Sequence, residues 1–174
     1  MSDVTGNVSR MVKTCLPTLV CLACAGLMVG GKAATKMKGK PLVAHIGKGI
    51  GAYTVGMPLA EARLRSGAGL KPEGLSRVGK TGWLAGPLLL IVDDESQKIE
   101  TISLTLRSSR GVVIDGAVLT PKLSLDEIQA ELPACTSSRG SGGRYVTCKN
   151  DKGTLSIYAS KKGDEIWIVI PGSA

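Results

Sequence analysis

Several short segments of this chain recur farther along it at a nearly constant spacing. The matched pairs are 51–53 with 116–118, 59–62 with 125–128, 86–90 with 153–157, and Ile99 with Ile166. Their offsets are 65, 66, 67 and 67 residues. Each match is short, but their agreement in spacing predicts an internal duplication of about 65 residues. We therefore expect a first repeat at 49–110 and a second at 111–174, each with the same arrangement of strands and helix.

Both halves begin with a predicted apolar strand and end with predicted antiparallel strands. The predicted strands lie near 50–55, 88–93, 98–107, 112–119, 144–149, 154–160 and 164–170. Turns are predicted at 94–97, 150–153 and 161–163, where polar residues and glycine gather. From Ile102 on, apolar residues alternate with Ser and Thr. One face of the sheet is therefore expected to pack on a helix while the other faces water.

A short helix is predicted between the first strand and the later strands of each half. In the first half, Pro58 suits the first helical turn and Gly67 suits its end. In the second half, residues 124–127 (SLDE) form a capping box, and Pro133 ends the helix. Helices on one face of an antiparallel sheet give the fold class α+β.

The helix start in the first half resembles a known repeat unit. Residues 56–62 (GMPLAEA), followed by a loop and an antiparallel hairpin, are similar to the repeat of the β-lactamase inhibitor proteins and to the SmpA/OmlA-type outer-membrane lipoproteins. The resemblance covers roughly residues 49–170 and implies two tandem helix-plus-antiparallel-sheet repeats. The inhibitor proteins use an aromatic-rich concave sheet, whereas this chain has two Trp, three Tyr and no Phe. The resemblance therefore implies a fold more than a particular target.

Residues 1–33 have the pattern of a secretory signal peptide. Arg10 and Lys13 precede an uncharged apolar run at 15–31, and small residues follow, so cleavage is expected after Ala33. Two alternatives stay open. The run could be an uncleaved membrane anchor, near the shortest length that spans a bilayer, or Cys24 could bear the lipid of a lipoprotein. We expect an exported protein of the periplasm or the cell envelope.

The basic charge of the chain is concentrated ahead of the predicted repeats. The formal charge is +8, but residues 49–174 carry 15 basic and 13 acidic residues. The segment 34–48 is therefore interpreted as a basic linker, with four lysines. Nucleic-acid recognition needs charge clustered on the folded body, so no nucleic-acid partner is expected. A basic N-terminal linker instead suits association with anionic lipid headgroups.

The cysteines divide in the same way. Three of the five lie at positions 15, 21 and 24, within the apolar run. Cys135 and Cys148 remain, 13 residues apart. In an exported protein such a pair predicts a disulfide.

Residues 74–81 (GLSRVGKT) match the P-loop pattern of nucleotide-binding proteins. A P-loop needs a hydrophobic strand before it and a helix after it, because the helix N-terminus holds the phosphate. Here the flanking segments, 66–72 and 82–87, are rich in glycine and proline and favour neither element. We therefore interpret the match as fortuitous and expect no cofactor.

The chain also lacks the usual groups of a catalytic site. His45 is the one histidine, no thiol would remain beside the disulfide, and no G-x-S-x-G pattern occurs. We therefore expect no enzyme activity, no catalytic residue and no metal site.

These features together predict an exported binding protein, an inhibitor or an immunity protein that neutralises a protein partner such as an antibacterial toxin. The candidate partner-binding residues are Arg139, Ser141, Arg144 and Tyr145, around a Gly-rich loop at 138–143, and Trp83. A loop closed by a disulfide is partly preorganised, which lowers the ordering cost of binding. Alternatively, the loop is a plain hairpin connection and Trp83 a core residue. The alternative function is an envelope-assembly or structural outer-membrane lipoprotein.

Overall fold

A computed structural model describes residues 40–74, 77–140, 143–160 and 165–172 of the chain. The chain divides into two units, residues 1–35 and 36–174, and everything described here belongs to the second. The predicted signal peptide, Cys24 and the start of the predicted linker lie outside the described residues.

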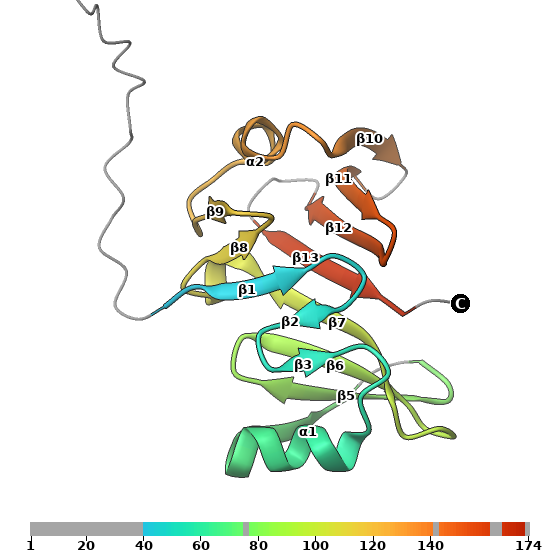
Figure 1. Ribbon diagram of the computed structural model, residues 1–174. Helices are drawn as coiled ribbons and strands as arrows, with labels where there is room; N and C mark the ends of the chain where they lie inside the picture. Colours follow the sequence, from blue (N-terminus) through green and yellow to red (C-terminus); the bar gives the residue numbers. More distant parts are fainter. Residues whose placement is uncertain (1–39, 75–76, 141–142, 161–164, 173–174) are drawn as a thin grey trace, which may run out of the picture. The chain divides into compact units, whose positions relative to one another are not determined.

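The largest element is an antiparallel sheet of eight strands in the order β10-β11-β12-β13-β7-β6-β5-β4 (Figure 1). Its strands are β4 (Leu70–Glu73), β5 (Lys80–Ala85), β6 (Leu88–Asp93), β7 (Ile99–Thr105), β10 (Thr136–Gly140), β11 (Gly143–Asn150), β12 (Gly153–Ala159) and β13 (Ile166–Pro171). The central neighbours are β7 and β13, which pair antiparallel with Ile168 opposite Leu104. Strands of the N-terminal half therefore fill one side of the sheet and strands of the C-terminal half the other.

A second sheet has five short strands in the order β3-β2-β1-β8-β9. These strands are β1 (Leu42–His45), β2 (Gly49–Ile50), β3 (Tyr53–Thr54), β8 (Val112–Ile114) and β9 (Ala117–Leu119). Strand β1 pairs parallel with β8, and the other neighbours are antiparallel. The two α-helices are α1 (Leu59–Ser66) and α2 (Leu125–Glu131), with 3-10 turns at Gly67–Gly69 and Leu106–Ser108.

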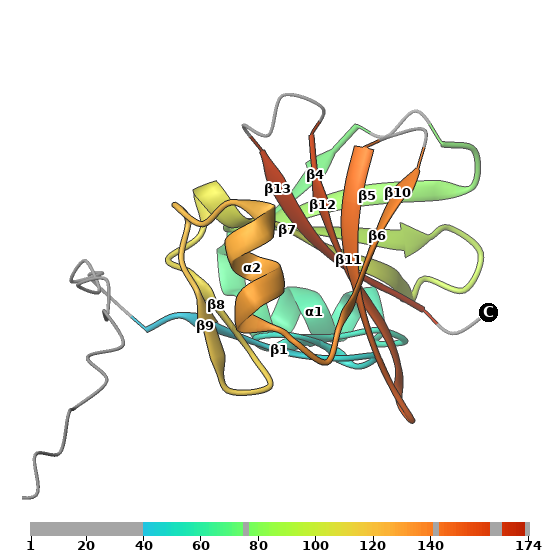
Figure 2. The ribbon, with the colours of Figure 1, turned by 90° about the horizontal axis from the view of Figure 1, so that it is seen from above.

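Both helices and the five-stranded sheet lie on the same side of the eight-stranded sheet, as two perpendicular views show (Figures 1 and 2). On that side Leu90, Ile102, Leu104 and Ile168 are fully buried. The core therefore lies between the two sheets. No described helix or strand covers the opposite face of the eight-stranded sheet, which we call the open face.

The expected α+β class is confirmed, and the local signals at both helices act as predicted. Pro58 is the N-cap of α1, and Gly67 ends the helix with a φ of 57° that suits glycine. Ser124 accepts from the backbone N–H of Glu127, and the carboxylate of Glu127 accepts from the backbone N–H of Ser124. This reciprocal capping box fixes the first turn of α2.

The predicted linker at 34–48 is wrong at its C-terminal end, because Leu42–His45 form β1. Alternate residues of this segment, Ala44 and Ile46, are buried, while His45 is exposed. This alternation of buried and exposed residues explains the strand. A count of charges over 34–48 does not reveal the strand, because lysines lie on both sides of it.

The single strands predicted near 50–55 and 112–119 are also wrong, because each is a hairpin of two short strands. The first, β2–β3, turns at Gly51, whose φ is 61°. The second, β8–β9, turns at Asp115 and Gly116, whose φ values are 47° and 87°. Consecutive positive φ values are those of a type I′ turn, which joins two strands directly.

Candidate functional site

The predicted loop at 138–143 is largely strand, and this is a correction. Residues 136–140 form β10 and pair with β11, with Ser138 opposite Tyr145 and Gly140 opposite Gly143. Strand β10 ends at Gly140 and β11 begins at Gly143, and the candidate Ser141 lies outside the described residues. Serine and glycine favour turns locally, but pairing with a long neighbour provides the bonds that keep β10 extended.

The expected disulfide between Cys135 and Cys148 is present. Cys135 directly precedes β10, and Cys148 lies in β11 with 1% of its surface exposed. The bond therefore ties the start of β10 to its neighbouring strand, at the end of the hairpin away from the turn.

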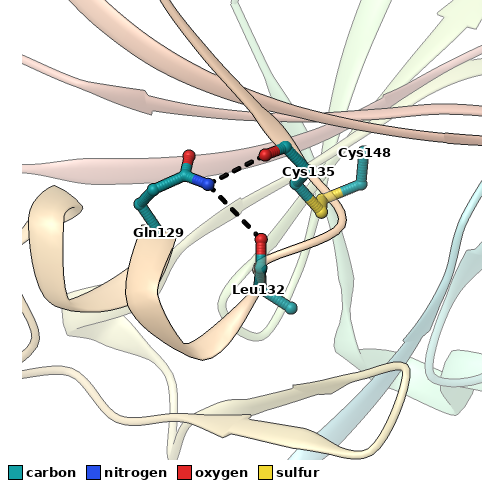
Figure 3. The surroundings of a disulfide bond; sticks show 4 residues. All are labelled: Gln129, Leu132, Cys135 and Cys148. Atoms are coloured by element: carbon teal, nitrogen blue, oxygen red, sulfur yellow. Dashed lines mark hydrogen bonds between the residues drawn. A yellow bond between two sulfur atoms is a disulfide. The ribbon is translucent and has the colours of Figure 1, made fainter.

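Gln129, in the last turn of α2, fixes the chain that leads into this hairpin. Its side-chain amide donates to the carbonyl of Cys135 at 2.8 Å and to that of Leu132 at 3.4 Å. Figure 3 shows both bonds beside the disulfide. Helix, connection and hairpin are thus tied together within a few residues.

Arg144 of β11 connects the hairpin to the start of α2. Its guanidinium donates to both carboxylate oxygens of Asp126, from Nη1 to Oδ2 at 3.1 Å and from Nη2 to Oδ1. The hydrogen bond from Arg144 lowers the pKa of Asp126, and the same bond raises the pKa of Arg144. A bidentate pair of this kind fixes direction as well as distance.

A second guanidinium lies beside this pair. Arg139 of β10 is directly opposite Arg144 in the strand register, and its charge also lowers the pKa of Asp126. Arg139 is exposed and makes no ion pair with any residue that the structure describes. Two cations therefore share one carboxylate on the helix side of the hairpin.

Tyr145 lies on the other side of the hairpin, on the open face. It pairs with Tyr158 of β12, which pairs with Trp167 of β13. The rings of Tyr145 and Tyr158 have centroids 5.8 Å apart, and Tyr158 is 42% exposed. We call Tyr145, Tyr158 and Trp167 the aromatic row. Directly paired residues share a face of a sheet, so the row presents three aromatic side chains together.

The neighbouring row of the open face carries no charge between β11 and β5, and Lys71 of β4 lies at its far end. Its residues are Thr147, Ser156, Val169, Ser103, Leu89 and Leu84. All are partly exposed, and they combine small hydroxyl groups with aliphatic side chains. The open face thus offers an apolar surface with hydrogen-bonding groups beside the aromatic row.

The structure brings together some of the predicted binding residues and separates others. Arg139, Arg144 and Tyr145 belong to one hairpin, but the arginines lie on its helix side and the tyrosine on the open face. Trp83 is in β5, and four strands (β12, β13, β7 and β6) separate it from β11 in the sheet order. It pairs with the buried Leu90 on the helix side and packs against the core, with the guanidinium of Arg63 4.6 Å from its ring centroid.

The sequence prediction missed Tyr158 and Trp167. The two-residue turn between Asn150 and Gly153 sets the register of β11 and β12, and this register places Tyr158 opposite Tyr145. The predicted turn at 150–153 therefore contains the information that places Tyr158 beside Tyr145. It becomes usable only when the two strands are paired through the turn.

The lysine and threonine of the P-loop match, Lys80 and Thr81, lie in β5, and residues 75–76 of the match are outside the described residues. Lys80 forms an ion pair with Glu100 at 2.5 Å, and the hydroxyl of Thr81 donates to Asp94 at 2.6 Å. The motif runs into a strand and not into the helix that a P-loop needs. Its lysine and threonine bond to Glu100 and Asp94 instead.

Within the described ranges, no group of three or more His, Cys, Asp and Glu side chains is arranged to hold a metal ion. None of the helices described is long and apolar enough to cross a membrane. Comparison with protein-family models, with curated proteins and with solved structures finds no match to this chain.

Proposed function

We propose that this is an exported, non-catalytic binding protein that holds a protein partner against the aromatic row and the β10–β11 hairpin. The observation that supports this most directly is the gathering of Tyr145, Tyr158 and Trp167 on the open face. Tyrosine and tryptophan are enriched in the energetically dominant parts of protein interfaces. The neighbouring row is uncharged from β11 to β5, which suits the centre of such an interface, where charged residues are depleted.

Preorganisation of the hairpin supports the same proposal. The disulfide, the bonds of Gln129 and the Asp126–Arg144 pair restrict the hairpin before any partner arrives. Ordering a binding segment in advance reduces the entropy lost on association. The disulfide is also the type of bond that persists in oxidising compartments, in agreement with the signal-peptide pattern.

We further propose that the chain is a tandem duplication, with repeats at 49–110 and 111–174. Two features support it. The order hairpin, helix, four strands occurs once as β2 to β7 and again as β8 to β13. The two sets of four strands also occupy opposite sides of the large sheet and meet at β7 and β13. The resemblance to the β-lactamase inhibitor proteins then makes an inhibitor or immunity protein the favoured kind of binder.

Affinity capture with the full-length protein from its native cell envelope, repeated with variants of the aromatic row, tests this function. We expect a protein partner to be retained by the unaltered chain and lost with Tyr158→Ala or Trp167→Ala, because each removes a large contact surface. Leu64→Ala is the matched control, since Leu64 is 84% exposed on α1. Retention that is the same for all four proteins would refute the aromatic row as the binding surface.

A further inference from the structure

The eight-stranded sheet has two edges, and they differ in how they are protected. Strand β4 contains Pro72, which has no N–H to donate, between the charged residues Lys71 and Glu73. Natural proteins use proline and charge in this way to keep other strands from pairing with an edge. Strand β10 contains no proline, and all five of its residues are exposed. The β10 edge is therefore the one that another strand can join.

The register identifies the backbone groups at this edge. Because Gly140 and Gly143 close the hairpin across two residues, they form a hydrogen-bonded pair, and bonded pairs alternate along antiparallel strands. The pair Ser138 and Tyr145 is therefore also bonded. The backbone N–H and C=O groups of Ser137 and Arg139 consequently point away from β11, toward the free edge.

The charges beside this edge are unbalanced. Arg139 and Arg144 are cross-strand neighbours, and like charges directly opposite each other destabilise a strand pair. Asp126 forms its bidentate bonds with Arg144. One carboxylate thus serves two guanidinium groups, and a second carboxylate at Arg139 would balance them.

We propose that the protein partner adds an extended segment to β10, and that this segment places an Asp or Glu side chain beside Arg139. The added strand would bond to the backbone groups of Ser137 and Arg139. Its side chains on the other face would lie next to Ser138, which pairs with Tyr145 on the open face. The added strand would therefore continue the row that contains Tyr145, with Ser138 between them. A second copy of this chain is a poorer occupant, because its β10 edge brings another guanidinium and no carboxylate.

This inference rests on the proposed function and names the segment of the partner that is bound. Its test uses a phage-displayed library of short random peptides, selected on the full chain with the disulfide intact. We expect selected peptides to alternate β-branched and polar residues and to share one acidic position. A synthetic peptide with Gln at that position should bind about tenfold more weakly than the acidic peptide. Arg139→Gln should abolish this difference, and Arg139→Lys should restore part of it.

Backbone pairing is tested on the peptide as well as on the protein. Ser137→Pro removes a donor from the free edge and should prevent binding. If that variant does not fold, N-methylation of alternate peptide amides replaces it, and one of the two methylation patterns should abolish binding while the other is tolerated. Amide resonances of β10 should shift on binding, whereas those of β4 should not.

Three results would overturn the inference: no peptide is enriched, the enriched peptides share no acidic position, or binding is insensitive to Ser137→Pro and to N-methylation. Dimerisation of the chain through β10 would overturn the chosen occupant. If the captured partner still requires Tyr158 and Trp167 in any of these cases, the proposed function stands and strand addition alone fails.

Discussion

Asp126 and Arg144 show how single side chains hold the candidate site in place. Asp126 is the second residue of α2, where a negative charge also interacts favourably with the helix dipole. Through Arg144 it connects that helix turn to β11. One carboxylate thereby stabilises both the start of the helix and the position of the hairpin.

This arrangement predicts a pH dependence of stability. Because the Arg144 hydrogen bond lowers the pKa of Asp126 in the folded protein, the ionised carboxylate stabilises the fold at neutral pH, and this contribution is lost as the pH falls below about 4. Urea unfolding of the parent and of Asp126→Asn should differ at pH 7, and the difference should shrink as the pH falls below about 4. The control is Asp151→Asn, in the exposed β11–β12 turn. A difference between parent and Asp126→Asn that is constant with pH would contradict the assigned cause.

For single residues, the sequence predicts interactions between residues close in the chain better than contacts that arise from strand pairing. The disulfide and the capping box follow from local spacing, and both are present. Tyr145 was a candidate, but Tyr158 and Trp167 join it only through strand pairing. Trp83 is a candidate from the sequence that packs against the core instead, because a large aromatic residue suits a core as well as a binding surface. Which face a residue occupies depends on strand register, and single residues do not reveal it.

At the scale of elements, strands with strong apolar patterns were predictable and weak ones were not. Strand β6 (Leu88–Asp93) lies where five apolar residues in succession predict it. Strands β4, β5 and β10 were not predicted, because they contain proline, glycine or serine at positions that locally favour turns. Their extended conformation comes from pairing with neighbouring strands. Strand β4 pairs with β5, β5 pairs with β6, and β10 pairs with β11. Tertiary contacts thus override local preference at the edges of the sheet.

Contact between the β1–β2 turn and the β11–β12 turn predicts a sensitive position. Gly47 has a φ of 67°, and a Cβ atom there would clash with the backbone carbonyl of Lys152. Gly47→Ala should therefore lower the free energy of unfolding by about 2 to 4 kcal/mol, from steric overlap and backbone strain together. Gly56→Ala is the matched control, because its φ is 80° and no atom lies within 4 Å of the added methyl.

Urea unfolding measures both variants, and Gly56→Ala should cost only the strain of about 1 kcal/mol expected for alanine at positive φ. Equal losses for the two variants would mean that the contact with Lys152 contributes nothing. A larger loss at Gly47 would show that the two turns form one packed unit at that end of the core.

For the whole molecule, the disulfide links stability to the compartment in which the chain folds. The Cys135–Cys148 bond closes a loop of 13 residues, which is worth about 3 kcal/mol in the chain-entropy model. Reductant should therefore lower the free energy of unfolding by about that amount. It should have no effect on the double variant Cys135→Ala/Cys148→Ala, which serves as the control. Unchanged urea midpoints for the parent in reductant would contradict this contribution.

The parallel pairing of β1 with β8 also has a consequence for the order in which the molecule can assemble. Leu42 lies opposite Val112 in the register, so the most N-terminal strand described must wait for a partner 70 residues later in the chain. Such non-local contacts slow folding, because a long segment must be ordered before they form. A chain that emerges N-terminus first therefore cannot complete its smaller sheet until most of its length is available. The five-stranded sheet should therefore close later than the hairpins, whose paired strands are adjacent in the chain.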